Sequence, residues 1–281
     1  MVDLHAHTDR SDGTLSPQGL VDLARQTNLT ALAITDHDTI AGYDAAAPYA
    51  REVGLELVCG VELGARYDGS AVHVLGYFLE APPDELFRRR LEELKQARRE
   101  RNERLAERLR SLGLDIRVEE AEALGREQTG RPHFARVLVE KGYAANYREA
   151  FEAYLDEQGK AFVPRREPSL ETVFGWIRDA RGVSSWAHPG RFVRKSGSKP
   201  ENSFRALAAR GLQAVEAYHR DHLPEESKRF DRAAQKLGLG VTGGSDFHGP
   251  TLGGVPLGGL HLKEELLERL RSFSRTLYPA A

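Results

Sequence analysis

Residues 3–13 read DLHAHTDRSDG, a short strand-like start followed by two histidines and a charged turn. His5 and His7 are two positions apart, and Asp12 follows in the turn. A hydrophobic core requires neither imidazole, whereas imidazole nitrogen and carboxylate oxygen are common ligands of divalent metal ions. The spacing alone is weak evidence for a metal site. Its meaning depends on the fold that the rest of the chain predicts.

Short apolar runs alternate with helix-like segments along most of the chain, which predicts a parallel α/β arrangement. The helix after the first strand has Ser16 as its expected N-cap and Pro17 at its first position. Cys59 lies in an apolar run and is expected in the core. The strands are predicted at residues 2–4, 31–35, 56–60, 72–78, 182–186, 212–217 and 240–242.

One region interrupts this alternation. We find no convincing strand between about residues 82 and 160, and residues 84–113 have the leucine spacing of one long amphipathic helix. Residues 88–110 carry ten Arg or Lys and five Glu. We therefore expect residues 82–160 to form a helical insertion that caps the substrate, with residues 1–81 and 161–281 forming the α/β unit.

Length and composition restrict the class of protein. A chain of 281 residues can bury one large core, or a core plus a smaller inserted unit. A net charge of −2 predicts no general attraction to nucleic acid or membranes. A single cysteine excludes an intrachain disulfide and favours a reducing compartment. No apolar run approaches the ~20 residues of a membrane span, and the N-terminus lacks signal-peptide features. We expect a cytoplasmic protein.

Histidines and carboxylates recur beside the predicted strands, mostly at their C-terminal ends. In parallel α/β folds these ends meet on one face, where functional sites form. One ion needs about four to six donors. Nine candidate ligands therefore predict two or three ions that share a carboxylate. Glu62, central in the chain order, is the expected bridge. The nine candidate ligands are His5, His7, Asp12, His37, Glu62, His73, His188, Asp246 and His248.

Each motif by itself has a simpler interpretation. A single histidine at a strand end is more often a surface or capping residue, and the segments AHPG and SDFH could be ordinary turns. The joint pattern is different, because chance does not readily place such residues beside so many successive strands. The sequence therefore predicts a centre with more than one metal ion.

The ordered motifs DLHAHTDRSDG, ITDHD, GVE, AHPG and SDFH, which span residues 3 to 248, resemble the polymerase and histidinol phosphatase (PHP) family of metal-dependent phosphoesterases. The resemblance implies a distorted seven-stranded (β/α)7 barrel with two or three divalent ions. Manganese is expected first, with iron, zinc or magnesium as alternatives. The resemblance further implies three ligand groups: His5, His7, Glu62 and Asp246; Asp12, His37, His188 and His248; and Glu62 with His73 and substrate phosphate.

Within the family, the helical segment with TGRPHFARVLVEKG at residues 129–142 resembles one particular branch. That branch removes the 3′-phosphate of nucleoside 3′,5′-bisphosphates and trims short RNA from its 5′ end. The resemblance implies phosphate contacts from Arg98, Arg101, Arg131 and His133. Without it, Arg98 and Arg101 would be interpreted as an exposed helix face. The expected partner is a small nucleotide or a short oligoribonucleotide. Duplex DNA is not expected, because tight duplex binding requires extensive phosphate neutralisation.

The expected mechanism uses a hydroxide that bridges the metal ions and attacks phosphorus in line with the leaving oxygen. His188, His248 or His133 could assist the leaving group, and the sequence does not choose among them. Asp36 and Asp38, which flank His37, could orient metal ligands or be solvated turn residues. Further candidates near the site are Arg191, His219 and His222.

Two other functions remain open at this stage, and the sequence predicts no oligomeric state. A histidinol-phosphate phosphatase would need a pocket for a cationic amine, which the basic helical segment does not favour. A non-catalytic, metal-loaded accessory domain would not need so complete a ligand set.

Overall fold

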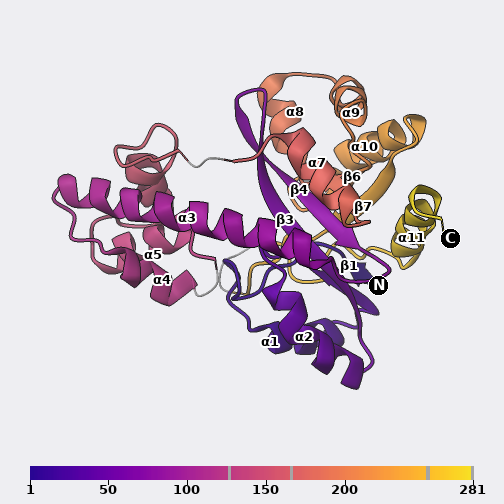
Figure 1. Ribbon diagram of the computed structural model, residues 1–281, viewed down its shortest axis with the longest axis horizontal. Helices are drawn as coiled ribbons and strands as arrows, with labels where there is room; N and C mark the ends of the chain where they lie inside the picture. Colours follow the sequence, from indigo (N-terminus) through magenta and orange to yellow (C-terminus); the bar gives the residue numbers. More distant parts are fainter. Residues whose placement is uncertain (126–127, 165–166, 251–253, 280–281) are drawn as a thin grey trace.

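The structure is a computed structural model that describes residues 1–125, 128–164, 167–250 and 254–279. Its centre is a seven-stranded sheet whose strands lie in chain order (Figure 1). All seven predicted strands are present, with small differences at the ends of most and a large extension of β3. The strands are β1 Val2–Asp3, β2 Ala31–Ile34, β3 Glu56–Tyr67, β4 Ser70–Phe78, β5 Val183–Trp186, β6 Ala214–His219 and β7 Gly240–Gly244.

The sheet closes on itself because the segment after β1 pairs with β7 and the residues that follow it. The amide of Leu4 donates to the carbonyl of Gly243 at 3.2 Å, and the amide of His7 donates to that of Phe247 at 2.8 Å. A barrel has no open edge with unpaired backbone groups. The expectation of a distorted seven-stranded barrel is confirmed.

The predicted parallel arrangement does not hold at β4, which pairs antiparallel with both β3 and β5. Strand β3 continues to Tyr67, well past the predicted end at residue 60. The chain then reverses through Asp68 and Gly69, whose φ angles of 47° and 73° suit a tight hairpin turn. Because β4 runs backwards, its first residues lie at the same end of the barrel as the C-terminal ends of its neighbours.

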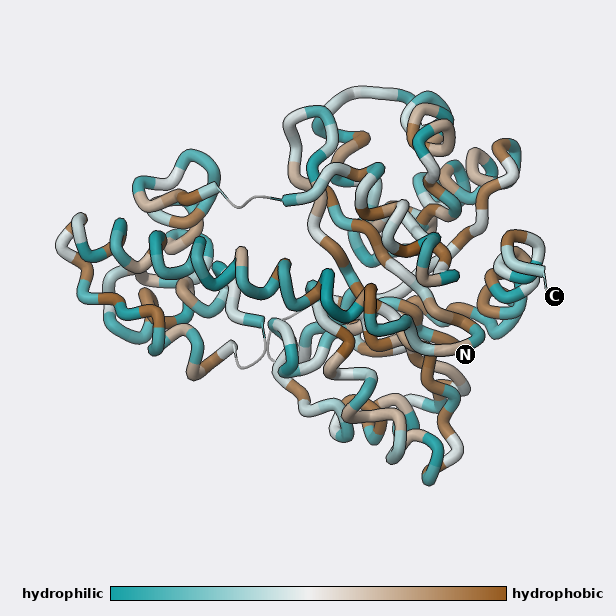
Figure 2. Tube along the Cα trace, viewed as in Figure 1, coloured by the Kyte–Doolittle hydropathy of each residue, from teal (hydrophilic) through white to brown (hydrophobic). Residues whose placement is uncertain are grey.

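Amphipathic helices cover the outside of the barrel (Figure 2), and their buried apolar residues belong to its hydrophobic clusters. The Ser16 hydroxyl accepts from the amide of Gly19 at 3.1 Å, which confirms it as an N-cap. Cys59 is 2% exposed and belongs to the core, as predicted. These helices are α1 Pro17–Gln26, α2 Ala41–Glu52, α7 Leu170–Asp179, α8 Gly190–Ser196, α9 Pro200–Ala208, α10 Pro224–Lys236 and α11 Glu265–Leu277.

A helical extension projects from one end of the barrel (Figure 1). Asp84 caps its long first helix by accepting from the amide of Phe87 at 2.9 Å. Leu86 and Leu112, part of the predicted leucine pattern, are exposed at 46% and 43%. The extension comprises α3 Glu85–Ser111, α4 Val118–Gly125, α5 Arg131–Glu140, α6 Tyr147–Ala150 and the π-helix η1 Phe151–Leu155.

Helix α3 belongs to two hydrophobic clusters. Near its start, Phe87 and Leu91 pack in the cluster of the barrel. Further along, Leu105 and Leu109 pack in a separate cluster with residues of α4 to η1. Helix α3 therefore runs without a break from the core of the barrel to the core of the extension.

Across the described residues, we find no helix with the length and apolarity to cross a membrane.

Candidate metal centre

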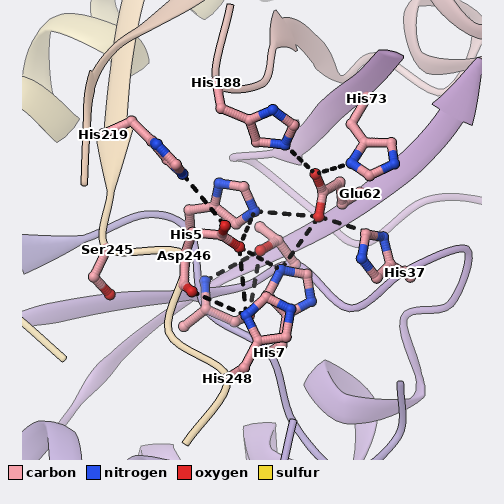
Figure 3. A network of polar contacts seen from close by, with 12 residues as sticks. His5, His7, His37, Glu62, His73, His188, His219, Ser245, Asp246 and His248 are labelled. Carbon is pink, nitrogen blue, oxygen red and sulfur yellow. Dashed lines mark hydrogen bonds and ion pairs between the residues drawn. The ribbon is translucent and has the colours of Figure 1, made fainter. Parts of the chain in front are cut away.

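The nine candidate ligands lie together at one end of the barrel (Figure 3). His5, His7 and Asp12 follow β1, and His37 follows β2. The other five come from β3, β4 and the segments after β5 and β7. His73 reaches this end because β4 is antiparallel to its neighbours.

Glu62 is the centre of the group and is 1% exposed. Its Oε2 lies 3.2 Å from Nε2 of both His5 and His7, and 3.3 Å from Nδ1 of His37. Its Oε1 lies 2.8 Å from Nδ1 of His73 and 3.0 Å from Nε2 of His188. A single carboxylate thus faces five imidazoles, the arrangement expected of a ligand shared between ions.

The ligand atoms form overlapping groups, and the atoms of each group lie within 4.8 Å of one another. Two histidines belong to other groups here than the family resemblance implied. His7 rather than His188 joins Asp12, and His37 joins the group of His73. The groups are His5, His7, Glu62 and Asp246; His7, Asp12, His37 and His248; and His37, Glu62 and His73.

The charges of the site suit bound cations. Burial raises the pKa of the Glu62 carboxyl, but the nearby imidazoles, His73 and His5 among them, outweigh it and hold this pKa well below its usual range. The same competition lowers the pKa of Asp12 and of Asp246. All three carboxylates therefore remain ionised, and those of Glu62 and Asp246 are buried, where a charge requires compensation.

The imidazoles divide into two kinds. Burial lowers the pKa of His37 and of His188 to about 4 despite the attraction of Glu62. Both imidazoles are therefore neutral at pH 7 and can donate a lone pair to a metal ion. Burial also opposes protonation of His7, but hydrogen bonds to Asp246 and Glu62 outweigh it and raise its pKa to about 10. His7 Nε2 lies 3.2 Å from Glu62 Oε2 and 3.3 Å from Asp246 Oδ1, within reach of both carboxylates. A mixed imidazole and carboxylate set of this kind fits manganese, iron or zinc.

A basic pocket adjoins the centre and is lined by Asp12, His37 and His73 on the barrel side. Three of the four predicted phosphate contacts, Arg98, Arg101 and Arg131, line its other side. Arg101 is only 5% exposed, so an exposed helix face is the wrong interpretation for it.

The fourth predicted contact, His133, is not among the residues that line this pocket. Its Nδ1 accepts from the amide of Gly130 at 3.0 Å. The ring proton therefore lies on Nε2, and burial lowers the pKa of this imidazole, which keeps it neutral. His133 supports the turn that leads into helix α5.

The two aspartates beside His37 are buried and are not solvated turn residues. Asp36 accepts from the amide of Thr8 and from the hydroxyl of Ser11, each at 2.7 Å, and so holds the turn that carries Asp12. Asp38 accepts a hydrogen bond from Arg98.

Of the further candidates, His222 uses both ring nitrogens on backbone groups, Ala217 O at 3.0 Å and Gly190 N at 3.1 Å. It supports the loop after β5. Arg191 pairs with Asp221 at 2.7 Å and lies at the rim, 3.9 Å from Asp246.

Sequence reasoning missed Glu216, a fully buried carboxylate in β6 whose Oε1 lies 2.8 Å from His5 Nδ1. The available signal was a glutamate between apolar residues in the predicted strand. His219, in the same strand, lies 3.3 Å from Asp246.

Known proteins are similar to this chain over most of its length. The PHP domain family matches residues 3–163. A 5′-3′ exoribonuclease of Haemophilus influenzae is 33% identical over 262 residues, which cover 91% of this chain and 92% of the relative. A 3′,5′-nucleoside bisphosphate phosphatase of Chromobacterium violaceum is 32% identical over 259 residues, with 92% and 90% covered. A crystal structure from Bifidobacterium adolescentis, described as a metal-dependent phosphoesterase, has a TM-score of 0.86 at 33% identity and covers 97% of this chain and 96% of its own.

Proposed function

Because this chain belongs to the PHP domain family and is a metal-dependent phosphoesterase, we propose that it hydrolyses phosphate esters of nucleotides. The proposed substrates are nucleoside 3′,5′-bisphosphates, from which it removes the 3′-phosphate, nucleoside monophosphates, and short RNA trimmed from the 5′ end. One observation carries this proposal: three arginines of the helical extension, together with Arg66 of β3, line a pocket directly beside the ligand centre. A substrate with two phosphates can place one phosphate at the ligand centre and the other at the arginines of the pocket.

The residues that would hold the ions are the nine candidates. His5, His7, Glu62 and Asp246 fit a first ion. Asp12, His37 and His248, with His188 or His7, fit a second, and Glu62 with His73 fits a third. Manganese is proposed first, with iron, zinc or magnesium as alternatives. Ions bound here would polarise the phosphate and lower the pKa of a coordinated water toward neutrality.

The chain's own groups bind and orient the second phosphate. Arginine presents a planar set of donors that matches phosphate oxygens. Arg131 is the first residue of α5, where the helix terminus also favours a negative charge. Arg98 and Arg101 approach from α3 on the same side of the pocket. These contacts would fix the nucleotide so that its other phosphate meets the centre.

The hydrogen bonds of His248 favour a ligand role over that of a proton donor. Its Nδ1 lies 2.9 Å from the carbonyl of Asp246 and must carry a proton to donate to it. Its Nε2, 3.3 Å from Asp12, is then the nitrogen with a free lone pair. We assign the same role to His188, whose Nε2 faces Glu62.

The proposed domain organisation follows from the same pocket. Residues 1–81 and 161–281 form the metal-binding barrel, and residues 82–160 cap its open end and supply the arginines. In support, the extension has a hydrophobic cluster of its own, although Ala161 and Val163 also belong to it. Enclosure between barrel and extension suits the phosphate of a nucleotide or of an RNA end better than continuous duplex DNA.

The alternative of a histidinol-phosphate phosphatase receives no support. A cationic amine would have to enter a pocket in which four arginines outnumber the carboxylates of Asp12 and Glu167, so that repulsion between like charges dominates. The two curated relatives described above are instead a nucleoside bisphosphate phosphatase and an exoribonuclease.

A metal analysis followed by a phosphate-release comparison tests the proposal. The Mn²⁺-loaded protein would be given adenosine 3′,5′-bisphosphate, 5′-AMP, histidinol phosphate and a 5′-phosphorylated oligoribonucleotide. We expect the highest kcat/KM on the bisphosphate or the oligonucleotide. Preference for histidinol phosphate would contradict the nucleotide assignment.

A further inference from the structure

Strand β6 carries none of the nine candidate ligands, yet two of its side chains lie directly behind them. Glu216 is fully buried and His219 is 2% exposed. Figure 3 shows His219 reaching Asp246 from one side of the centre. A buried carboxylate and imidazole are costly unless they are paired.

Both oxygens of Glu216 are in use. Oε1 lies 2.8 Å from Nδ1 of His5, and Oε2 accepts from the backbone amide of His188 at 2.6 Å. An ionised carboxylate accepts but cannot donate, so Nδ1 of His5 carries a proton. Nε2 of His5, 3.2 Å from Glu62, is therefore the nitrogen directed at the centre.

His219 acts on Asp246 in the same way. Its Nδ1 accepts from the amide of Asp221 at 3.1 Å, so its proton lies on Nε2. That nitrogen is 3.3 Å from Oδ2 of Asp246. The other oxygen, Oδ1, lies 3.3 Å from His7 and 3.4 Å from His5. His219 thus lies against one oxygen of Asp246, and the other oxygen faces the centre.

A β-bulge makes this arrangement possible. In a regular strand, residues three positions apart point to opposite faces. The register against β7 shifts between Glu216 and Tyr218, so that Glu216 lies opposite Thr242 and His219 lies opposite Gly244. Thr242 and Gly244 are two apart and share a face, and their partners Glu216 and His219 therefore share one too. An extra residue in a strand commonly re-aims a side chain in this way.

We propose that Glu216 and His219 are positioning residues of the metal centre, holding His5 and Asp246 in the protonation pattern and orientation that metal ions need. This inference rests on the proposed metal-binding function. Nitrogen and oxygen atoms of His5, Glu216 and His219 also lie close enough for an ion of their own. The hydrogen bonds argue against that reading, because both oxygens of Glu216 and Nδ1 of His219 are already occupied by N–H donors.

The two readings differ in a measurable way. Loss of a carboxylate that hydrogen-bonds a metal-ligating histidine typically weakens metal affinity about 10- to 100-fold. Loss of a ligand to a separate ion would instead lower the number of ions bound at saturation. Glu216→Gln preserves size while removing the charge, and His219→Gln removes the imidazole donor to Asp246.

The experiment titrates the metal-free full chain with Mn²⁺ and follows free Mn²⁺ by electron paramagnetic resonance, with elemental analysis at saturation. We expect both variants to bind Mn²⁺ about 10- to 100-fold more weakly with an unchanged number of ions. The visible absorption of the Co²⁺-loaded Glu216→Gln protein should also shift, because His5 becomes a poorer donor. Tyr218→Phe is the control, since that hydroxyl bonds Asp231 on the outer side; it should match the wild type.

Unchanged Mn²⁺ affinity in both variants would overturn the inference while leaving the proposed function intact. A lower ion count at saturation would overturn it in favour of a separate site. If Glu216→Gln fails to fold, by its metal-free melting curve, His219→Gln decides by the same criteria. If the wild-type chain binds no Mn²⁺, the same titration is made with Fe²⁺, Zn²⁺ and Mg²⁺, and binding of none of these ions would overturn the proposed function and this inference together.

Discussion

The guanidinium of Arg98, on helix α3, donates a hydrogen bond to the buried carboxylate of Asp38, the residue that follows His37. Asp38 has a φ of 53°, and its Oδ1 also accepts from the amide of Gly64 at 3.4 Å. Its carbonyl accepts from the side chain of Gln128 at 3.1 Å. One residue beside the metal centre therefore ties the barrel to the helical extension and orients an arginine of the basic pocket.

Asp38→Asn is expected to loosen this connection without disturbing the backbone, because asparagine tolerates a positive φ. We expect kcat/KM for adenosine 3′,5′-bisphosphate to fall about tenfold, equivalent to ~1.4 kcal/mol, mainly through KM. Steady-state kinetics would measure it. Asp44→Asn is the matched control. Asp44 pairs at an exposed position with Arg88, which lies on helix α3 as Arg98 does. An equal loss in both variants would contradict the role given to Asp38.

The Arg98→Ala/Arg101→Ala double variant tests the basic pocket. A charge-assisted hydrogen bond contributes ~1.5–3 kcal/mol, so we expect a loss of about 10- to 100-fold in kcat/KM on the bisphosphate. p-Nitrophenyl phosphate, which has a single phosphate, should be hydrolysed at nearly the wild-type rate. Arg104→Ala, an exposed position on the same helix, is the control. Equal losses on both substrates would mean that the arginines support folding or the metal centre instead.

Glu62→Gln should reduce turnover more than His73→Ala. Glu62 lies within 3.3 Å of five imidazole nitrogens, whereas His73 lies at the edge of the centre with its side chain 36% exposed. Turnover of Mn²⁺-loaded protein, with metal content measured in parallel, would rank the two variants. A nearly active Glu62→Gln beside an inactive His73→Ala would remove Glu62 from its bridging role.

Strong chelation should abolish phosphatase activity, and Mn²⁺ should restore it. The reason is the nine-donor set, in which buried carboxylates face neutral imidazoles. Phosphate release would be followed before chelation, after dialysis and after Mn²⁺ addition. Full activity in protein shown by elemental analysis to contain no metal would contradict the proposed chemistry.

Metal affinity should rise with pH between about 6.5 and 10. In this window the metal-free folded chain holds a proton on His7, whose pKa is raised to about 10 from 6.5, and an unfolded chain does not. That proton stabilises the metal-free fold below pH 6.5, and its contribution is lost as pH rises through 10. A bound ion must displace it. Calorimetry at pH 8 in buffers of different ionisation enthalpy should detect proton release on Mn²⁺ binding. Identical heats in both buffers would argue against it.

Much of this protein can be predicted from its sequence. The seven strands, the Ser16 cap, the long α3 helix and the nine side chains at the centre follow from hydrophobic period, cap chemistry and the recurrence of histidine and carboxylate beside the strands. These signals are local, because each depends on residues within a few positions of one another. The ordered motifs also identify the family.

The tertiary structure alone decided the features that depend on pairing between distant segments. The reversal at Asp68 and Gly69 brings His73 to the centre, although it stands near the start of its strand. Burial between α3 and the rest of the extension turns Arg101 into a pocket residue. The bulge in β6 directs Glu216 and His219 to one face. Strand direction, register and burial arise from contacts with other parts of the chain, and no local pattern records them.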